Sequence, residues 1–66
     1  MLSTTIGVNV RNRRLELGWS QERLAYESGL CVRTVSAIEC GDANPTSDVI
    51  ESLARALGVS VSWLVW

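Results

Sequence analysis

Apolar residues recur at intervals of three or four along most of this chain, and a glycine follows four of the apolar runs. Such intervals place side chains on one face of an α-helix, and a glycine directly after the run favours the left-handed turn that ends a helix. These glycines are Gly18, Gly29, Gly41 and Gly58. The pattern predicts an all-α fold, a compact bundle of five short helices.

The first predicted helix follows Ser3 or Thr4, either of which is a suitable N-cap residue. Its inward stripe consists of Ile6, Val10 and Leu17. Val8 and Leu15 lie on the opposite side, which indicates either an early kink or a second contact surface. Arg14 lies beside the apolar stripe, where a cation is costly unless a carboxylate meets it, so the pattern predicts an acidic partner elsewhere in the chain.

The next two predicted helices are short and closely joined. A helix capped by Ser20 breaks at Gly29, and another covers residues 32–39. The inward side chains of the two helices are Leu24, Ala25, Val35 and Ile38. The outward side chains of the second are Arg33, Ser36, Ala37 and Cys40. Two helices of about eight residues joined by a tight turn form a helix-turn-helix, here about residues 21–40, whose second helix fits the DNA major groove.

After a loop over residues 41–45, Thr46 or Ser47 caps a fourth predicted helix. Its inward stripe consists of Ile50, Leu53, Ala54 and Leu57. Ser60 can cap a last, strongly apolar segment over residues 61–66. No internal repeat or linker interrupts the pattern, so residues 1–66 are expected to form a single domain.

The chain has 66 residues and a net charge of −1, but its charges are unevenly distributed. The basic half, residues 1–33, contains Arg11, Arg13, Arg14, Arg23 and Arg33. The acidic half, residues 34–66, contains only Arg55 against Glu39, Asp42, Asp48 and Glu51. All six cations are arginine, the side chain suited to bidentate pairing with phosphate or guanine. By itself, however, this distribution of charges is also typical of an ordinary protein surface with mixed charges.

Residue types that carry metal and acid–base chemistry are scarce. The sequence has no histidine and only two cysteines, Cys31 and Cys40, which are too few ligands for a zinc site. A helix between them would hold them more than about 10 Å apart, so they cannot form a disulfide with each other. No pair of groups has an active-site spacing. The chain is therefore not expected to be an enzyme, or to bind a cofactor or a small-molecule substrate.

Nothing in the sequence points to secretion or to a membrane. The N-terminal residues are too polar for a signal peptide, and no apolar run approaches the roughly 20 residues needed to span a bilayer. Together with the free thiols, these features predict a soluble protein of the reducing cytoplasm.

Motifs in four successive predicted helices share the order and separation of a known family. They are Ile6-Gly7, Arg14, Gly18 to Ala25, Gly29, Val35, Ile38-Glu39, Gly41, Asn44-Pro45, Leu53-Ala54 and Ala56 to Ser60. Over about residues 6–65 this pattern resembles the Cro and lambda-repressor-like helix-turn-helix family of transcriptional regulators, the XRE type. The resemblance implies double-stranded DNA as the partner.

The resemblance also implies roles for residues at matching positions. Base contacts are expected from Val32, Arg33 and Ala37. Contacts with the DNA backbone are expected from Ser20, Gln21, Cys31, Thr34, Ser36, Cys40 and Asn44. Arg14 and Glu39 correspond to a buried structural ion pair, which supplies the partner that Arg14 requires.

Some positions depart from the family pattern. Cys31 replaces the Ser or Thr that often begins the third helix, and Cys40 and Asp42 stand where Arg or Lys is common. Asp42 would repel a phosphate. Only Arg33 has the donors for a guanine contact, worth about 1–3 kcal/mol if bidentate, whereas the apolar side chains at the other two base-contact positions could touch a thymine methyl group. Specificity per monomer is therefore expected to be low.

The last six residues carry more apolar surface than so short a segment can bury. One small module binds DNA weakly, and the resemblance implies that two copies bind together as a two-fold homodimer on half-sites about 34 Å apart. Candidates for the dimer contact are Trp63, Val65 and Trp66. Alternatively, Trp63 and Leu64 complete the core of the monomer, and Trp66 marks the end of a fragment. The sequence favours neither arrangement.

Two functions are open at this point. The first is sequence-specific DNA binding by a transcriptional regulator, with the third helix in the major groove. The second is a protein-interaction module on the same scaffold, such as an antitoxin-like or regulatory subunit, because a fold does not determine a function. The acidic balance, Asp42 and the apolar Val32 and Ala37 favour the second.

Overall fold

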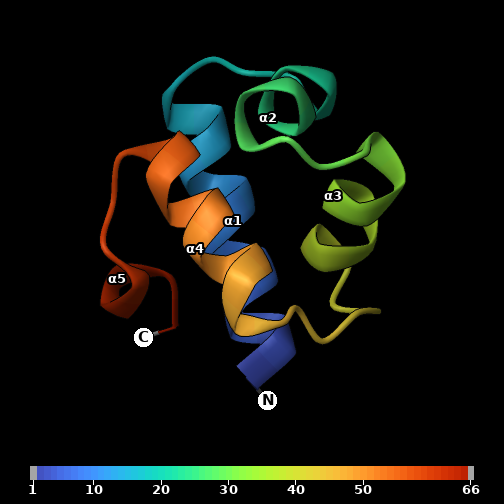
Figure 1. Ribbon diagram of the computed structural model, residues 1–66, viewed down its shortest axis with the longest axis vertical. Helices are drawn as coiled ribbons and strands as arrows, with labels where there is room; N and C mark the ends of the chain where they lie inside the picture. The colour runs from blue at the N-terminus through green and yellow to red at the C-terminus, as the bar shows by residue number, and fades with distance from the viewer. Residues whose placement is uncertain (1, 66) are drawn as a thin grey trace.

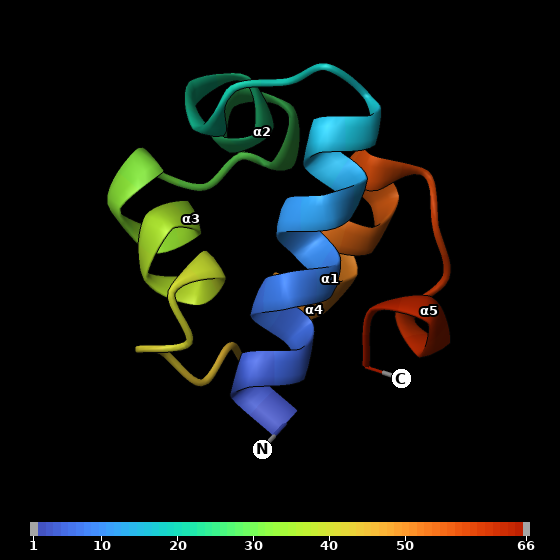
Figure 2. The same cartoon turned by 180° about the vertical axis from the view of Figure 1, so that it is seen from behind.

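The computed structural model describes residues 2–65, and within this range the chain forms five α-helices and no strand (Figure 1). The helices are α1 (Leu2–Glu16), α2 (Gln21–Ser28), α3 (Val32–Glu39), α4 (Ser47–Leu57) and α5 (Val61–Val65). α1 and α4 lie side by side at the centre, with α3 on one side of this pair and α5 on the other (Figure 1, Figure 2). The prediction of an all-α bundle of five helices is confirmed.

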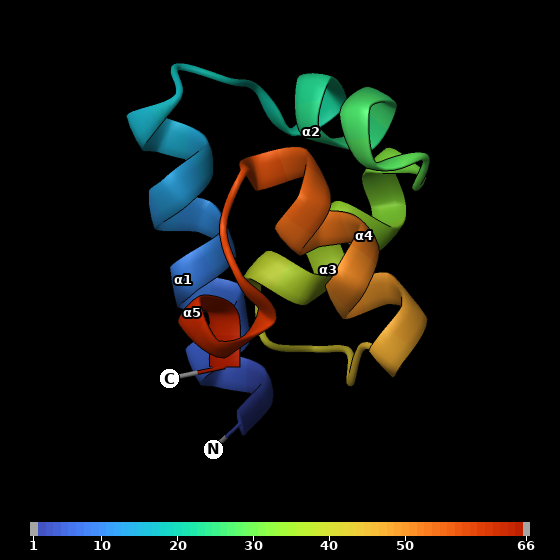
Figure 3. The same cartoon turned by 60° about the vertical axis from the view of Figure 1, so that its left-hand side comes forward.

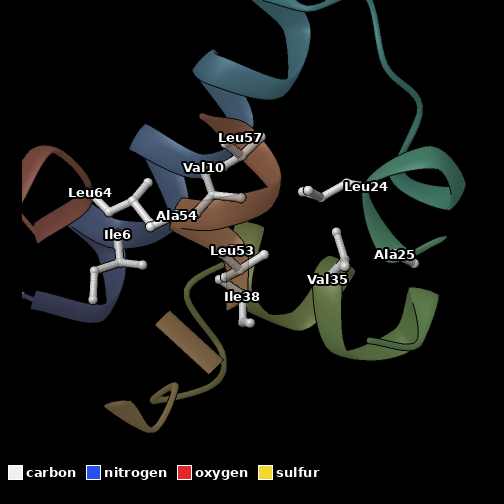
Figure 4. Packing of buried hydrophobic residues seen from close by; sticks show 10 residues of the cluster. All are labelled: Ile6, Val10, Leu24, Ala25, Val35, Ile38, Leu53, Ala54, Leu57 and Leu64. Atoms are coloured by element: carbon white, nitrogen blue, oxygen red, sulfur yellow. The ribbon is translucent and has the colours of Figure 1, made fainter. Parts of the chain in front are cut away.

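The hydrophobic core takes side chains from all five helices (Figure 4). Its buried members are Ile6, Val10, Leu24, Ala25, Val35, Ile38, Leu53, Ala54, Leu57 and Leu64. Full burial of one such Leu, Ile or Val side chain contributes about 1.5–3 kcal/mol, so this cluster is the main source of stability. Leu17 and Ile50 were predicted to face inward and are only partly buried, because they lie after the end of α1 and in the first turn of α4.

Hydroxyl side chains cap three of the helices. In each case the side-chain oxygen accepts a hydrogen bond from the backbone N–H three residues later. The distances are 3.0 Å from Arg23 to Ser20, 3.3 Å from Val49 to Thr46 and 3.1 Å from Trp63 to Ser60. The structure thus selects Thr46 over Ser47 as the cap of α4. The four glycines predicted to end helical runs all have left-handed φ angles, between 71° and 78°.

The start of α1 differs from the prediction. The helix begins at Leu2, so Ser3 and Thr4 lie inside it rather than at its N-cap. Hydroxyl residues are compatible with a first turn, whose N–H groups are unpaired in any helix, and a run of three such residues offers several equivalent starting points. The sequence therefore located the helix but not its first residue.

Val8 and Leu15 do not mark a kink, because α1 runs without interruption for 15 residues. Their exposed fractions are 49% and 54%. Since they are seven residues apart, they lie on the same face of the helix. The two side chains form an exposed apolar stripe on α1, and the second contact surface predicted from them stays a prediction.

Gly7 allows α1 and α3 to approach each other closely. A Cβ atom at this position would overlap the carbonyl oxygen of Ile38 and would lie 3.1 Å from that of Glu39. The backbone of α1 thus lies directly against the last turn of α3. This contact fixes the C-terminal end of α3 relative to the core.

Two polar side chains of α1 bind carbonyl groups at the ends of other helices. Arg13 Nε donates to the carbonyl oxygen of Leu57 at the end of α4 (3.0 Å), where the helix dipole also favours a cation. Asn9 Nδ2 donates to the carbonyl oxygen of Leu64 in α5 (2.8 Å). The first bond joins α1 to the end of α4, and the second holds the short α5 against α1 (Figure 3).

Candidate nucleic-acid interface

α2 and α3 are joined by a turn of three residues. Gly29 ends α2 with a φ of 75°, and the N–H of Leu30 donates to the carbonyl oxygen of Ala25 (3.0 Å), which satisfies an otherwise unpaired group at the helix end. Leu24 of α2 and Val35 of α3 are fully buried between the two helices and the rest of the core (Figure 4). The arrangement is the helix-turn-helix that the sequence predicted.

The outer face of α3 combines one cation with small and apolar side chains. The side chain of Arg33 is exposed and makes no hydrogen bond or ion pair with any other residue between 2 and 65. Val32 is 38% exposed, whereas Ser36 and Ala37 are half-buried. The three expected base-contact residues therefore share this face, and only Arg33 among them presents side-chain hydrogen-bond donors.

Glu39, at the end of α3, holds the interface together from inside. It accepts hydrogen bonds from Arg14 Nε (2.7 Å) and Nη2 (3.0 Å), and a third from Gln21 Nε2 (3.1 Å). Arg14 also donates to the carbonyl oxygen of Trp19 (2.7 Å). The side chain of Glu39 is 4% exposed, and hydrogen bonding to it raises the pKa of Arg14 despite the opposing effect of burial. The ion pair expected between Arg14 and Glu39 is thus present in the structure.

Gln21 links the start of α2 to this buried pair. It occupies the first position of α2, directly after the cap Ser20, and its amide group is oriented by Glu39. This hydrogen bond was not predictable from the sequence, because the two residues are 18 positions apart and lie on different helices. Gln21 is therefore a preorganised polar group at the edge of the interface.

Cys31 begins α3 but does not cap it, since its side chain makes no hydrogen bond with the first turn of backbone N–H groups. Its Sγ lies 3.0 Å from Thr34 Oγ1. A hydrogen bond to sulfur stabilises the thiolate, so the side-chain contact with Thr34 lowers the pKa of the exposed Cys31 thiol. Cys40, at the other end of α3, is also exposed, and both cysteines are free.

The remaining residues expected at the DNA backbone lie beyond the two ends of α3. Ser20 is exposed at the start of α2, and Asn44 is exposed in the loop between α3 and α4. Asp42 lies three residues after the last residue of α3, and its N–H donates to the carbonyl oxygen of Ala37 (3.0 Å). The loop thus presents a carboxylate close to the end of α3, where a phosphate would be repelled.

The C-terminal segment was predicted either to form a dimer contact or to complete the core of the monomer, and its residues differ in burial. Leu64 is fully buried and completes the core, whereas Trp63 is 43% exposed and Val65 is half-buried. The alternative in which Trp63 and Leu64 both fill the core is therefore wrong for Trp63, because α5 turns these neighbouring side chains to different faces. Trp66 lies outside the described residues.

Residues 10–64 match the Helix-turn-helix family. The chain belongs to this family. Family members and structural neighbours are DNA-binding regulators, not enzymes. No helix among the described residues is long and apolar enough to cross a membrane.

Three comparisons place this helix-turn-helix protein among its relatives. It is 41% identical over 64 residues to the Neisseria hypothetical transcription factor of Neisseria meningitidis serogroup B, covering 97% of this chain and 60% of the relative. The restriction-modification controller protein C.AhdI from Aeromonas hydrophila has a TM-score of 0.90 at 35% identity, with 94% of each chain covered. The controller protein C.Esp1396I, solved as a tetramer with its natural 35 base-pair operator, has a TM-score of 0.86 at 35% identity, covering 91% of this chain and 79% of that chain.

Proposed function

We propose that the protein is a sequence-specific, DNA-binding transcriptional regulator that inserts α3 into the major groove of its operator. The observation that carries this proposal is Arg33, an exposed and unpaired cation on the outer face of a helix whose far side is anchored by Arg14 and Glu39. A rigid helix with one free bidentate donor group is suited to reading guanine.

The contacts divide into two kinds. Arg33 reads a guanine, while Val32 and Ala37 touch base edges without hydrogen bonds, so the apolar pair favours thymine methyl groups. Phosphate contacts position the helix but carry no sequence information. In this proposal they come from Ser20, Gln21, Cys31, Thr34, Ser36, Cys40 and Asn44.

The regulator acts as a two-fold homodimer. The folded chain measures 26 × 22 × 20 Å, so one copy is shorter than the spacing of about 34 Å between the half-sites of a two-fold operator. Trp63 and Val65 of α5, with Trp66 beyond the described range, form the dimer contact. α5 lies across α1 from α3 (Figure 2), so this contact leaves the outer face of α3 uncovered. The assembly of the relative C.Esp1396I on an operator supports binding as more than one copy.

Regulation in this proposal is steric. The bound dimer occupies its operator, and promoter geometry decides between repression and activation. The domain comprises residues 1–66, acts in the cytoplasm, and uses no catalytic residue, cofactor or small-molecule substrate.

Selection of bound duplexes from a random pool tests the proposal. We expect an enriched two-fold sequence with one guanine per half-site that depends on Arg33. Arg33→Ala should abolish the preference at that base pair, whereas Gln21→Ala should weaken binding to cognate and random duplex alike. Because Gln21→Ala removes a phosphate contact, its binding affinity should also depend less on salt concentration than that of the parent protein.

The same experiment separates the protein-interaction alternative. If the protein binds no duplex even at low salt, the proposed function is wrong and the exposed faces of α3 and α5 serve a protein partner instead. If Arg33→Ala affects cognate and random DNA equally, DNA binding stands but Arg33 does not read a base.

A further inference from the structure

We propose that Arg11, on α1 and outside the helix-turn-helix, binds a DNA phosphate beside the groove that receives α3, and so positions that helix. The inference rests on the proposed function, and it adds a positioning residue that the family resemblance did not assign. Its basis is the distribution of charge over the six arginines, together with the place of Arg11 on α1.

Three of the six arginines are neutralised by carboxylates. The pairs are Arg13 with Glu16 (3.3 Å), Arg14 with Glu39 (2.7 Å) and Arg23 with Glu27 (2.7 Å). Arg23 also lies over the ring of Trp19, at 5.1 Å from its centroid. Each of these cations thus already has an acidic partner within the fold.

The other three differ in their local surroundings. Arg55 follows Glu51 by four residues, which places a carboxylate one helical turn away. Arg11 and Arg33 have no acidic residue three or four positions away in either direction, and neither has an ion pair within the described range. Arg55 forms no ion pair within the described residues either, so the two arginines that lack both an ion pair and an acidic residue one helical turn away are Arg11 and Arg33. Arg33 already lies on α3.

Arg11 lies on the side of α1 that faces α3. It is four residues after Gly7 and three before Arg14, so all three share one side of the helix. Gly7 lies against the carbonyl groups of Ile38 and Glu39, and Arg14 binds Glu39. Unlike Gly7 and Arg14, Arg11 is exposed, so its guanidinium extends into solvent beside the C-terminal half of α3.

A cation at this position could bind a DNA phosphate in the proposed complex. A helix in the major groove lies between two phosphate backbones, and an arginine pairs with phosphate through charge-assisted hydrogen bonds. The loop after α3 presents Asp42 rather than a cation. Cys40 and Asn44, the phosphate contacts proposed at this end of α3, carry no positive charge. A charge-assisted contact there would therefore come from a neighbouring element, and Arg11 of α1 is an exposed cation on the side that faces α3.

The test compares Arg11→Gln with Arg55→Gln, which removes the same charge from α4. Equilibrium binding of the full chain to its selected operator and to a random duplex is measured between 50 and 200 mM salt. We expect Arg11→Gln to bind both duplexes more weakly and to reduce the log–log salt slope by about 0.9, the contribution of one phosphate contact. Arg55→Gln should keep the parent slope, and Arg11→Lys should retain most of it. Thermal unfolding should be unchanged in all three variants.

The outcomes separate this inference from the proposed function. An Arg11→Gln variant that binds with the parent slope overturns the role of Arg11 and leaves DNA binding intact. Equal changes in Arg11→Gln and Arg55→Gln also overturn it, because they would report net charge rather than a contact. Failure of the parent protein to bind either duplex at low salt overturns the proposed function itself.

Discussion

At the scale of single residues, Glu39 determines how the helix-turn-helix is held. Its carboxylate receives Arg14 from α1 and Gln21 from the start of α2, so one buried group connects three helices. The ion pair was predictable from the resemblance and from the cost of an unpartnered cation beside an apolar stripe. The bond from Gln21 was not, since no local pattern relates side chains from separate helices.

Replacing Glu39 by alanine should destabilise the fold strongly. The guanidinium of Arg14 would stay buried without its partner, which costs about 3–5 kcal/mol in the free energy of unfolding. Urea denaturation measures this loss. The control Glu27→Ala breaks the exposed pair with Arg23 and should cost less than about 1 kcal/mol. Equal losses in the two variants would show that the pair with Arg14 contributes no more than a surface ion pair.

The thiol of Cys31 offers a second test at this scale. Because the side-chain hydrogen bond with Thr34 lowers the pKa of Cys31, the thiolate should form at lower pH than in an ordinary cysteine. Alkylation rates measured against pH in a Cys40→Ser background report this pKa. Thr34→Val should raise the pKa toward its ordinary value, and an unchanged rate profile would contradict the hydrogen bond.

At the scale of elements, the sequence predicted the helices well and their first residues less well. The glycines that end α2 and α4 and the hydroxyl caps of α2, α4 and α5 act within one turn, so a local pattern is sufficient to locate them. α1 has no comparable single signal at its start, and the prediction there was wrong. The close approach of α1 to α3 at Gly7 was also not predictable, because it does not change the spacing of apolar residues along the sequence.

Gly7→Ala tests that closeness. Alanine would favour the helix by about 1 kcal/mol over glycine, but its Cβ would overlap a backbone carbonyl oxygen of α3, which cannot rotate away as a side chain does. Overpacking costs about 1–3 kcal/mol, so we expect a net loss of stability in thermal unfolding. Val8→Ala, on the exposed face of the same helix, should change stability by no more than about 0.5 kcal/mol. A stabilised Gly7→Ala variant would mean that α1 and α3 can separate freely.

At the scale of the whole molecule, α3 and α5 lie on opposite sides of the central pair α1 and α4 (Figure 1). Under the proposed function, the α3 surface binds DNA while the α5 surface binds a second copy of the chain. Exposed apolar side chains on α5 include Val61 and Trp63, at 41% and 43%, and exposed aromatic groups are enriched at interfaces.

Trp63→Ser should shift the protein from dimer toward monomer in sedimentation equilibrium without DNA. The matched control is Tyr26→Ser, which removes an aromatic side chain of α2 that is 82% exposed, the highest value among the aromatic residues between 2 and 65. We expect the control to remain dimeric. Dissociation by both variants, or by neither, would exclude a specific dimer contact at Trp63.

The sequence alone determined the helix count, the apolar stripes, the turn at Gly29 and the need for a carboxylate opposite Arg14, because each follows from spacing along the chain or from the cost of burying a charge. Only the tertiary structure decided which arginines are neutralised, which end of α3 meets α1, and which face Trp63 occupies. These depend on contacts between residues distant in sequence, and burial and pairing are properties of the packed molecule rather than of any local segment.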